Sequence, residues 1–119
     1  MAIISIKNLL LRTVVGFNPH ELGKKQDLLF NIKIHYQLQA EDISDEPIHA
    51  LDYRKLCKQI IGHVESNQYN LLEKVASEVA SLILSKERVT RVDVEVDKPH
   101  ALRFAESVSF FISKTKQDA

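Results

Sequence analysis

The sequence predicts an α+β domain, in which two helices cover one face of a four-stranded antiparallel sheet. Two segments with alternating apolar residues come first, two segments with helical periodicity follow, and two more alternating segments end the chain. The order β-β-α-α-β-β makes each strand pair antiparallel neighbours and keeps the helices together. The chain has 119 residues, the usual size of one domain, so we expect a single domain over residues 1–119.

The first two strands are expected to be joined by a loop. "AIISIKNLLLRTVV" is rich in β-branched residues and should end near Gly16. The following "GFNPHELGKKQD" holds two of the three glycines and one of the three prolines, which is typical of a connection. "LLFNIKIHYQL" then alternates strictly, which predicts a strand with one buried face. The apolar residues of that face are Phe30, Ile32, Ile34, Tyr36 and Leu38.

Two helices are expected, over residues 52–66 and 71–86. The segment before them, "AEDISDEPIHA", is acidic and contains a proline, which indicates a loop or a short distorted turn. The first helix has apolar residues at helical spacing, namely Leu56, Ile60 and Val64. The apolar face of the second helix comprises Leu72, Val75, Val79, Leu82 and Ile83. Asn70, with Glu73 three residues later, forms the pattern of a capping box at the start of this helix.

The last two strands have a basic cluster between them. "RVTRVDVEVDK" and "SVSFFISK" both alternate, and the stretch that joins them contains Lys98, His100 and Arg103. Pro99 lacks an N–H donor and therefore ends strand pairing after Lys98. A four-stranded sheet leaves two open edges, and pairing between subunits often closes such edges.

Composition narrows the possible functions. Basic and acidic residues number 16 each, so bulk charge gives no support for nucleic-acid or membrane binding. Cys57 is the single cysteine, no segment has the length of a membrane span, and the N-terminus lacks a signal-peptide pattern, so we expect a cytoplasmic protein. The five histidines lack metal-site spacing, and no motif for nucleotide hydrolysis, serine hydrolysis or dinucleotide binding occurs.

Lys98 and Glu21 are candidates for chemistry, although both have ordinary explanations. A lysine at a strand end is usually solvated, and a glutamate in a loop is usually a surface group. A functional Lys98 would transfer protons after desolvation or nearby cations had lowered its pKa toward neutrality. Glu21 would then orient the substrate or the lysine.

Glu73 and Tyr53 are two further candidates at expected helix starts. The capping box accounts for Glu73 without any ligand. The same carboxylate could instead accept two parallel hydrogen bonds from the N–C–NH₂ edge of a heterocycle. Tyr53 is either a packing residue with its hydroxyl in solvent or a proton donor or acceptor beside a substrate hydroxyl.

The chain resembles the dihydroneopterin aldolase family over nearly its whole length. The segments that carry the resemblance are "IISIKNLLLRTVVGF", "HELGKKQDL", "ALDYRKL", "HVESNQYNLLEKVASEVA" and "VEVDKPHALRFAESVS". The resemblance implies a tunnelling fold (T-fold), in which four β-β-α-α-β-β subunits form a ring around a β-barrel. Two rings would stack into a homo-octamer, with each active site at a subunit interface and built from two chains.

The resemblance also implies roles for particular residues. Glu73 matches the glutamate that holds the N–C–NH₂ edge of a pterin, and Leu72 matches the residue that contributes backbone contacts beside it. Lys98 matches the general acid/base, Tyr53 the tyrosine near the side-chain hydroxyls, and Glu21 the glutamate of the loop that faces the substrate. The implied chemistry needs no metal and no cofactor, because the pterin ring accepts the electrons when the C1′–C2′ bond breaks. Release of the aldehyde fragment gives an aldolase, whereas its re-addition to the opposite face gives an epimerase.

The stretch "DKPHALRFAESVS" resembles the epimerases of this family, which act on dihydroneopterin triphosphate. Aldolases tend to have a small, glycine-containing stretch there, whereas this chain has His100 and Arg103. Arginine suits phosphate because it donates two parallel hydrogen bonds. We therefore expect Arg103 and His100, with Lys24 or Lys25, to meet the triphosphate.

Other readings remain open at this point. Arg103 could instead pair with Glu106 or with another carboxylate at a subunit interface. Pro99 is an aldolase-like feature, so an aldolase that releases 6-hydroxymethyl-7,8-dihydropterin and glycolaldehyde is the alternative enzyme. A ring that binds pterins or purines without catalysis is the alternative outside the enzymes.

Overall fold

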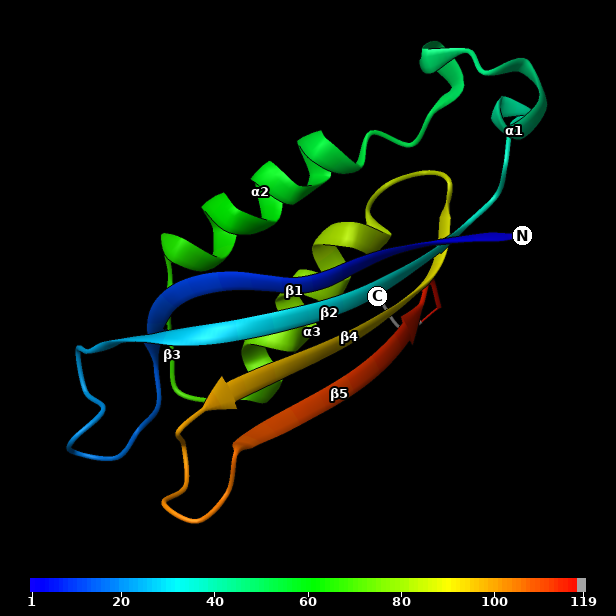
Figure 1. Cartoon of the computed structure of the whole chain (residues 1–119). Helices are drawn as coiled ribbons and strands as arrows, with labels where there is room; N and C mark the ends of the chain where they lie inside the picture. The colour runs from blue at the N-terminus through cyan, green and yellow to red at the C-terminus, as the bar shows by residue number, and fades with distance from the viewer. Residues whose placement is uncertain (118–119) are drawn as a thin grey trace.

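The computed structural model describes residues 1–117 and contains one five-stranded sheet with two longer helices on one face (Figure 1). Four long strands make up most of the sheet: β1 (Ala2–Val15), β2 (Lys25–Tyr36), β4 (Val89–Pro99) and β5 (Ser107–Thr115). The remaining elements are α1 (Glu41–Ser44), the 3₁₀ helix η1 (Pro47–His49), α2 (Tyr53–Glu65), the short strand β3 (Gln68–Tyr69) and α3 (Leu72–Leu84). The strands lie in the order β3-β1-β2-β4-β5.

Strand pairing confirms the antiparallel core of the sheet and adds one strand that the sequence analysis missed. The pairs β1/β2, β2/β4 and β4/β5 are antiparallel, whereas β3 pairs with β1 in parallel. The parallel contact joins only Val14 and Val15 to Gln68 and Tyr69. A two-residue strand is too short for alternation to reveal it.

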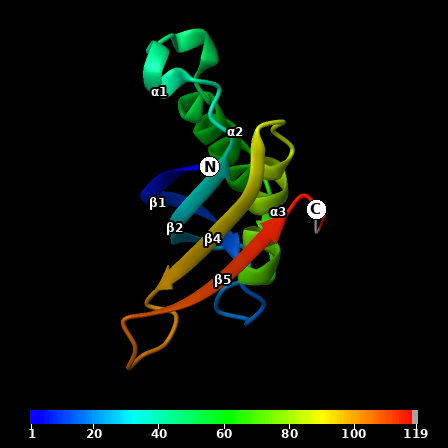
Figure 2. The ribbon, with the colours of Figure 1, turned by 90° about the vertical axis from the view of Figure 1, so that its right-hand side faces the viewer.

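The core lies between the sheet and the two longer helices, both of which cover the same face (Figure 2). Strand β2 buries the alternating residues predicted for it, with the exception of Leu38, which is 37% exposed. The prediction for Leu38 was wrong because β2 ends at Tyr36 and the next residue, Gln37, turns to hydrogen bond with Arg88. The predicted helical faces are buried or partly buried against this core.

Helix α3 begins differently from the capping box that the sequence indicated. Its N-cap is Leu71 in an extended conformation, and no side chain caps the helix. The pairing of Tyr69 with β1 keeps the chain extended through Leu71, so the helix starts one residue later than Asn70 would require. Neither Asn70 nor Glu73 is therefore used to close the helix start.

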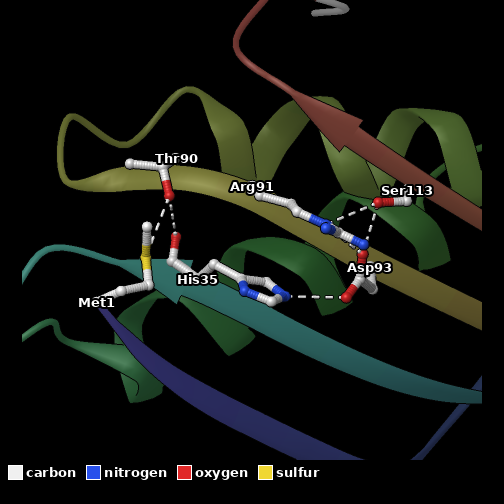
Figure 3. A network of polar contacts seen from close by, with 6 residues as sticks. All are labelled: Met1, His35, Thr90, Arg91, Asp93 and Ser113. Carbon is white, nitrogen blue, oxygen red and sulfur yellow. Dashed lines mark hydrogen bonds and ion pairs between the residues drawn. The ribbon is translucent and has the colours of Figure 1, made fainter.

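The face of the sheet away from the helices carries a network of polar side chains. Figure 3 shows His35 and Arg91 on either side of Asp93, with Ser113 beside them. Ser113 Oγ lies 2.6 Å from Asp93 Oδ1, Arg91 Nε lies 3.1 Å from the same oxygen, and His35 Nε2 lies 2.9 Å from Oδ2. Burial opposes the charge on Asp93, but the hydrogen bonds from Ser113, His35 and Arg91 lower its pKa. The network ties β2, β4 and β5 together on this face.

No helix in residues 1–117 combines the length and the apolar character needed to cross a membrane.

Candidate active site

Four of the predicted site residues line one pocket of about 170 Å³ at the end of the sheet. Its walls come from the end of β1 and the loop that follows, from the start of α3, and from the end of β4. The predicted residues in its lining are Glu21, Leu72, Glu73 and Lys98. The short strand β3 brings the first loop and the start of α3 together. Gly16 N donates a hydrogen bond to Tyr69 O at 3.1 Å, which joins the loop after β1 to the segment before α3.

Lys98 and Glu21 form a buried ion pair inside this pocket. The pairing of Lys98 with Val108 and of Pro99 with Ser107 continues the β4–β5 ladder to the pocket. The expectation that pairing ends after Lys98 was therefore wrong by one residue, because β4 includes Pro99. Lys98 Nζ donates a hydrogen bond to Glu21 Oε2, and the two side chains are only 12% and 8% exposed. Low exposure strengthens such a contact, because little water competes for either charge.

Two amide side chains hold the Glu21 carboxylate in place. Asn18 Nδ2 donates to Oε1 at 2.9 Å, and Gln26 Nε2 donates to Oε2 at 3.0 Å. Gln26 Nε2 also donates to Val15 O at 2.7 Å, which ties the carboxylate to the end of β1. The hydrogen bond from Gln26, followed by the one from Lys98, lowers the pKa of Glu21 to about 2. Glu21 is therefore an anion at neutral pH and keeps a positive charge favourable at Lys98 Nζ.

Gly16 leaves the space that the Glu21 carboxylate occupies. Its φ is +125°, a conformation that residues with a Cβ rarely adopt. A Cβ at this position would lie 2.5 Å from both Oε1 and Oε2 of Glu21. The glycine is thus required by its backbone conformation and by this close approach.

The sequence analysis missed Asn18 and Gln26 as parts of the site. Both are polar residues in or beside a loop, and such residues are common on any surface. Only the folded loop shows that their side chains turn inward to the same carboxylate.

Glu73 lies in the first turn of α3 and is one of the residues that line the pocket. Within residues 1–117 it has no hydrogen-bond or ion-pair partner, so its acceptor oxygens are open to a ligand. Leu72 beside it is partly buried against the core, which anchors this turn. A helix N-terminus with a free carboxylate suits a ligand edge that carries N–H donors.

Tyr53 is not brought to this pocket within one chain. It begins α2 and is 57% exposed, whereas the pocket adjoins β3, which follows the other end of α2. The 13 residues of α2 give it a length of about 20 Å. A single chain therefore places Tyr53 and Lys98 at opposite ends of this helix.

His100 and Arg103 lie in the exposed β4–β5 loop and do not line the pocket. His100 has a φ of 62°, and its N–H donates to Glu106 O at 3.5 Å. The Arg103 guanidinium lies 5.4 Å from the centroid of the Phe104 ring. Within residues 1–117 the Arg103 guanidinium lies over an aromatic ring and has no ion pair with Glu106.

The fold places a buried Lys98–Glu21 ion pair beside a small cavity on an α+β scaffold. Comparison with known proteins gives a match to the family model described as FolB, dihydroneopterin aldolase, over residues 4–113. The chain belongs to the dihydroneopterin aldolase family.

Relatives within the family refine this assignment. The chain is 45% identical over 112 residues to the dihydroneopterin triphosphate 2′-epimerase of Escherichia coli, covering 94% of this chain and 93% of that protein. It is 46% identical over 114 residues to the enzyme of the same name from Pseudomonas aeruginosa, covering 95% and 92%. Among solved structures, E. coli dihydroneopterin aldolase in complex with neopterin matches with a TM-score of 0.89 at 30% identity, covering 96% and 99%. This likeness confirms the predicted tunnelling-fold subunit.

Proposed function

We propose that this chain is an epimerase that inverts C2′ of 7,8-dihydroneopterin triphosphate and gives the dihydromonapterin isomer. The observation that carries the proposal is the identity of 45% and 46% to two epimerases, against 30% to the aldolase whose structure it matches. The pocket supports it, because the Lys98–Glu21 pair and the open Glu73 carboxylate lie around one space.

The four predicted residues of the pocket lining each have a proposed role in this reaction. Glu73 accepts hydrogen bonds from the N–C–NH₂ edge of the pterin, and the backbone at Leu72 contacts the ring beside it. Lys98 exchanges protons with the substrate through ordered water as the general acid/base. Glu21 accepts a hydrogen bond from Lys98 Nζ and so fixes its position.

The bond changes balance without an added oxidant or reductant. Loss of the 2′-hydroxyl proton forms the C2′ aldehyde while the C1′–C2′ bond breaks, and the electron pair of that bond enters the C=N of the ring. Attack of the same carbon on the opposite face of the aldehyde, with return of the proton to oxygen, inverts C2′. Release of the aldehyde before re-addition, with protonation at C1′, is the aldolase reaction, which we expect as a side activity.

We infer that the complete site contains Tyr53 from a neighbouring subunit. Support comes from the distance of Tyr53 from Lys98 within one chain, since a tyrosine at the start of α2 cannot reach its own pocket. The sheet also has two edges that could pair with another subunit. On one edge β3 pairs only with Val14 and Val15 of β1, and on the other edge the outer side of β5 pairs with no strand in residues 1–117. A homo-octamer of two tetrameric rings, in the cytoplasm, is the proposed assembly.

Basic residues at the pocket end of the sheet would meet the triphosphate. The loop after β1, with Lys24 before Lys25 of β2, and the β4–β5 loop, with His100 and Arg103, project from the same end of the molecule (Figure 1). Arg103 is exposed and has no carboxylate partner in residues 1–117, so its guanidinium is available to an anion.

One assay tests this function. The protein is incubated with dihydroneopterin triphosphate and, separately, with dihydroneopterin, and the neopterin and monapterin isomers and 6-hydroxymethyl-dihydropterin are resolved. We expect isomerisation of the triphosphate to be the fastest reaction. Hydroxymethyl product as the main outcome from the unphosphorylated substrate would identify an aldolase, and pterin binding without turnover would identify a binding protein.

A further inference from the structure

Residues 38–52 form an arm that projects from the far end of the sheet and leads into α2 at Tyr53 (Figures 1 and 2). The arm contains α1 and η1, and neither has a buried residue. Ile43 and Ile48 are 84% and 85% exposed. Packing against the core therefore does not hold these two short helices.

Arg88 contacts the residue before the arm, Gln37, and two residues within the arm, Glu41 and His49. Its Nε and Nη2 donate to Gln37 O at 3.0 and 2.7 Å, where the chain leaves β2 for the arm. Its Nη1 donates to His49 O at 2.6 Å near the exit, and its Nη2 forms an ion pair with Glu41 of α1. A planar guanidinium can serve such separate acceptors because its five donors point outward in one plane.

Arg88 is itself fixed to the body of the molecule. It lies just before β4, its carbonyl accepts from Gln37 N at 3.1 Å, and its guanidinium lies 5.5 Å from the centroid of the buried Tyr36 ring. The side chains of Arg88 and Glu41 are only 15% and 14% exposed. The hydrogen bond from Arg88 lowers the pKa of Glu41 to about 2, so the pair is charged at neutral pH.

We propose that Arg88 is a positioning residue, which holds the arm so that the start of α2 presents Tyr53 to the pocket of a neighbouring subunit. The inference rests on the proposed function, in which Tyr53 acts in a site of another chain. His49 precedes Tyr53 by four residues, and Tyr53 N donates to Leu51 O at 2.9 Å, so only a short, hydrogen-bonded stretch of chain separates the Arg88 contact from Tyr53. A displacement of about 1 Å at a reacting group can lower turnover about 10²-fold.

Mixed oligomers give the test, because Lys98 and Tyr53 of one site would come from different chains. Lys98→Ala and Tyr53→Phe subunits should each be weakly active alone. After unfolding and refolding together in equal amounts, about a quarter of the interfaces should pair an intact Lys98 with an intact Tyr53. Recovery of activity in this mixture establishes the shared site.

Arg88→Ala should behave as a Tyr53 variant in these mixtures. Alone, it should bind pterin as the wild type does, because Glu73 and Leu72 are untouched, while turnover falls about 10²-fold. It should recover activity with Lys98→Ala, because that partner supplies a well-held Tyr53, and it should not recover with Tyr53→Phe. A general loss of structure would show no such distinction between partners. Arg12→Ala, a surface arginine paired with Asp27, is the matched control and should keep wild-type turnover.

Each contrary result has a separate meaning. Recovery of Arg88→Ala with Tyr53→Phe, or wild-type turnover of Arg88→Ala alone, would overturn the positioning role. Failure of the Lys98→Ala and Tyr53→Phe pair would overturn the shared site, and the inference would fall with it. If Arg88→Ala does not assemble, Glu41→Ala takes its place under the same criteria, because it leaves the contacts of Arg88 with Gln37 and Tyr36 intact.

Discussion

The pocket around Lys98 and the arm that leads to Tyr53 lie at opposite ends of the molecule and are held by different means. At the pocket, one carboxylate, Glu21, collects hydrogen bonds from three side chains of its own chain. At the arm, one guanidinium, Arg88, donates to Gln37 at the entry and to Glu41 and His49 within a segment whose two short helices have no buried residue.

The two ends therefore differ in what a single chain holds in place. The pocket has a buried ion pair with low exposure on both sides, so a single chain already holds the Lys98 side chain in place. Tyr53, which follows the arm, is 57% exposed and does not line the pocket around Lys98. Four experiments test this difference between the pocket and the arm.

The largest effect is expected at the pocket end from Lys98→Ala. Turnover should fall at least about 10²-fold, the scale of general acid/base catalysis, while pterin affinity changes little. Steady-state kinetics and a fluorescence titration with the pterin measure the two quantities. Turnover equal to the wild type would remove Lys98 from the mechanism.

Gly16→Ala should damage the pocket end through the backbone. The strained φ and the clash with the Glu21 carboxylate should lower the free energy of unfolding by about 1–3 kcal/mol and reduce turnover as well. Gly62→Ala is the matched control, because its Cβ meets nothing within 4 Å in α2, and it should stabilise by about 0.5–1 kcal/mol. Chemical denaturation measures both, and a neutral Gly16→Ala would show that the carboxylate can move aside.

Acid should lower the free energy of unfolding through two carboxylates, Glu21 at the pocket and Glu41 at the arm. The folded-state pKa values of Glu21 and Glu41 are lowered from 4.5 to about 2. Their contribution to stability is complete above the ordinary pKa of about 4.5 and is lost as the pH falls toward 2. Glu21→Gln and Glu41→Gln should therefore each flatten the decline of the unfolding free energy in this window. Glu87→Gln, on the surface between α3 and β4, should leave the wild-type slope, and an unchanged slope in all three variants would contradict the lowered values.

The smallest effect is expected from Arg103→Ala, in the loop beside the pocket. If Arg103 meets phosphate, the KM for dihydroneopterin triphosphate should rise more than the KM for dihydroneopterin, on the scale of about tenfold for one charged hydrogen bond. Steady-state kinetics with both substrates make the comparison. Equal changes for the two substrates would assign Arg103 to a structural contact.

Much of the fold could be predicted from the sequence, because alternation and helical spacing are local properties. The strands over Phe30 to Tyr36 and Val92 to Val96 and the helix around Ile60 were predicted close to their observed bounds. The capping box at Asn70 and the position of Leu38 were wrong, because tertiary contacts at β3 and at Arg88 redirected the chain there.

The sequence by itself determined the order of the long strands and helices and their buried faces. Through family resemblance it also indicated the candidate site residues. Only the tertiary structure decided that Glu21 and Lys98 form a buried pair, that Asn18 and Gln26 hold it, and that Tyr53 lies elsewhere. The physical reason is that periodicity is set by neighbours within a turn or a strand. Contacts between residues dozens of positions apart depend on how the elements pack.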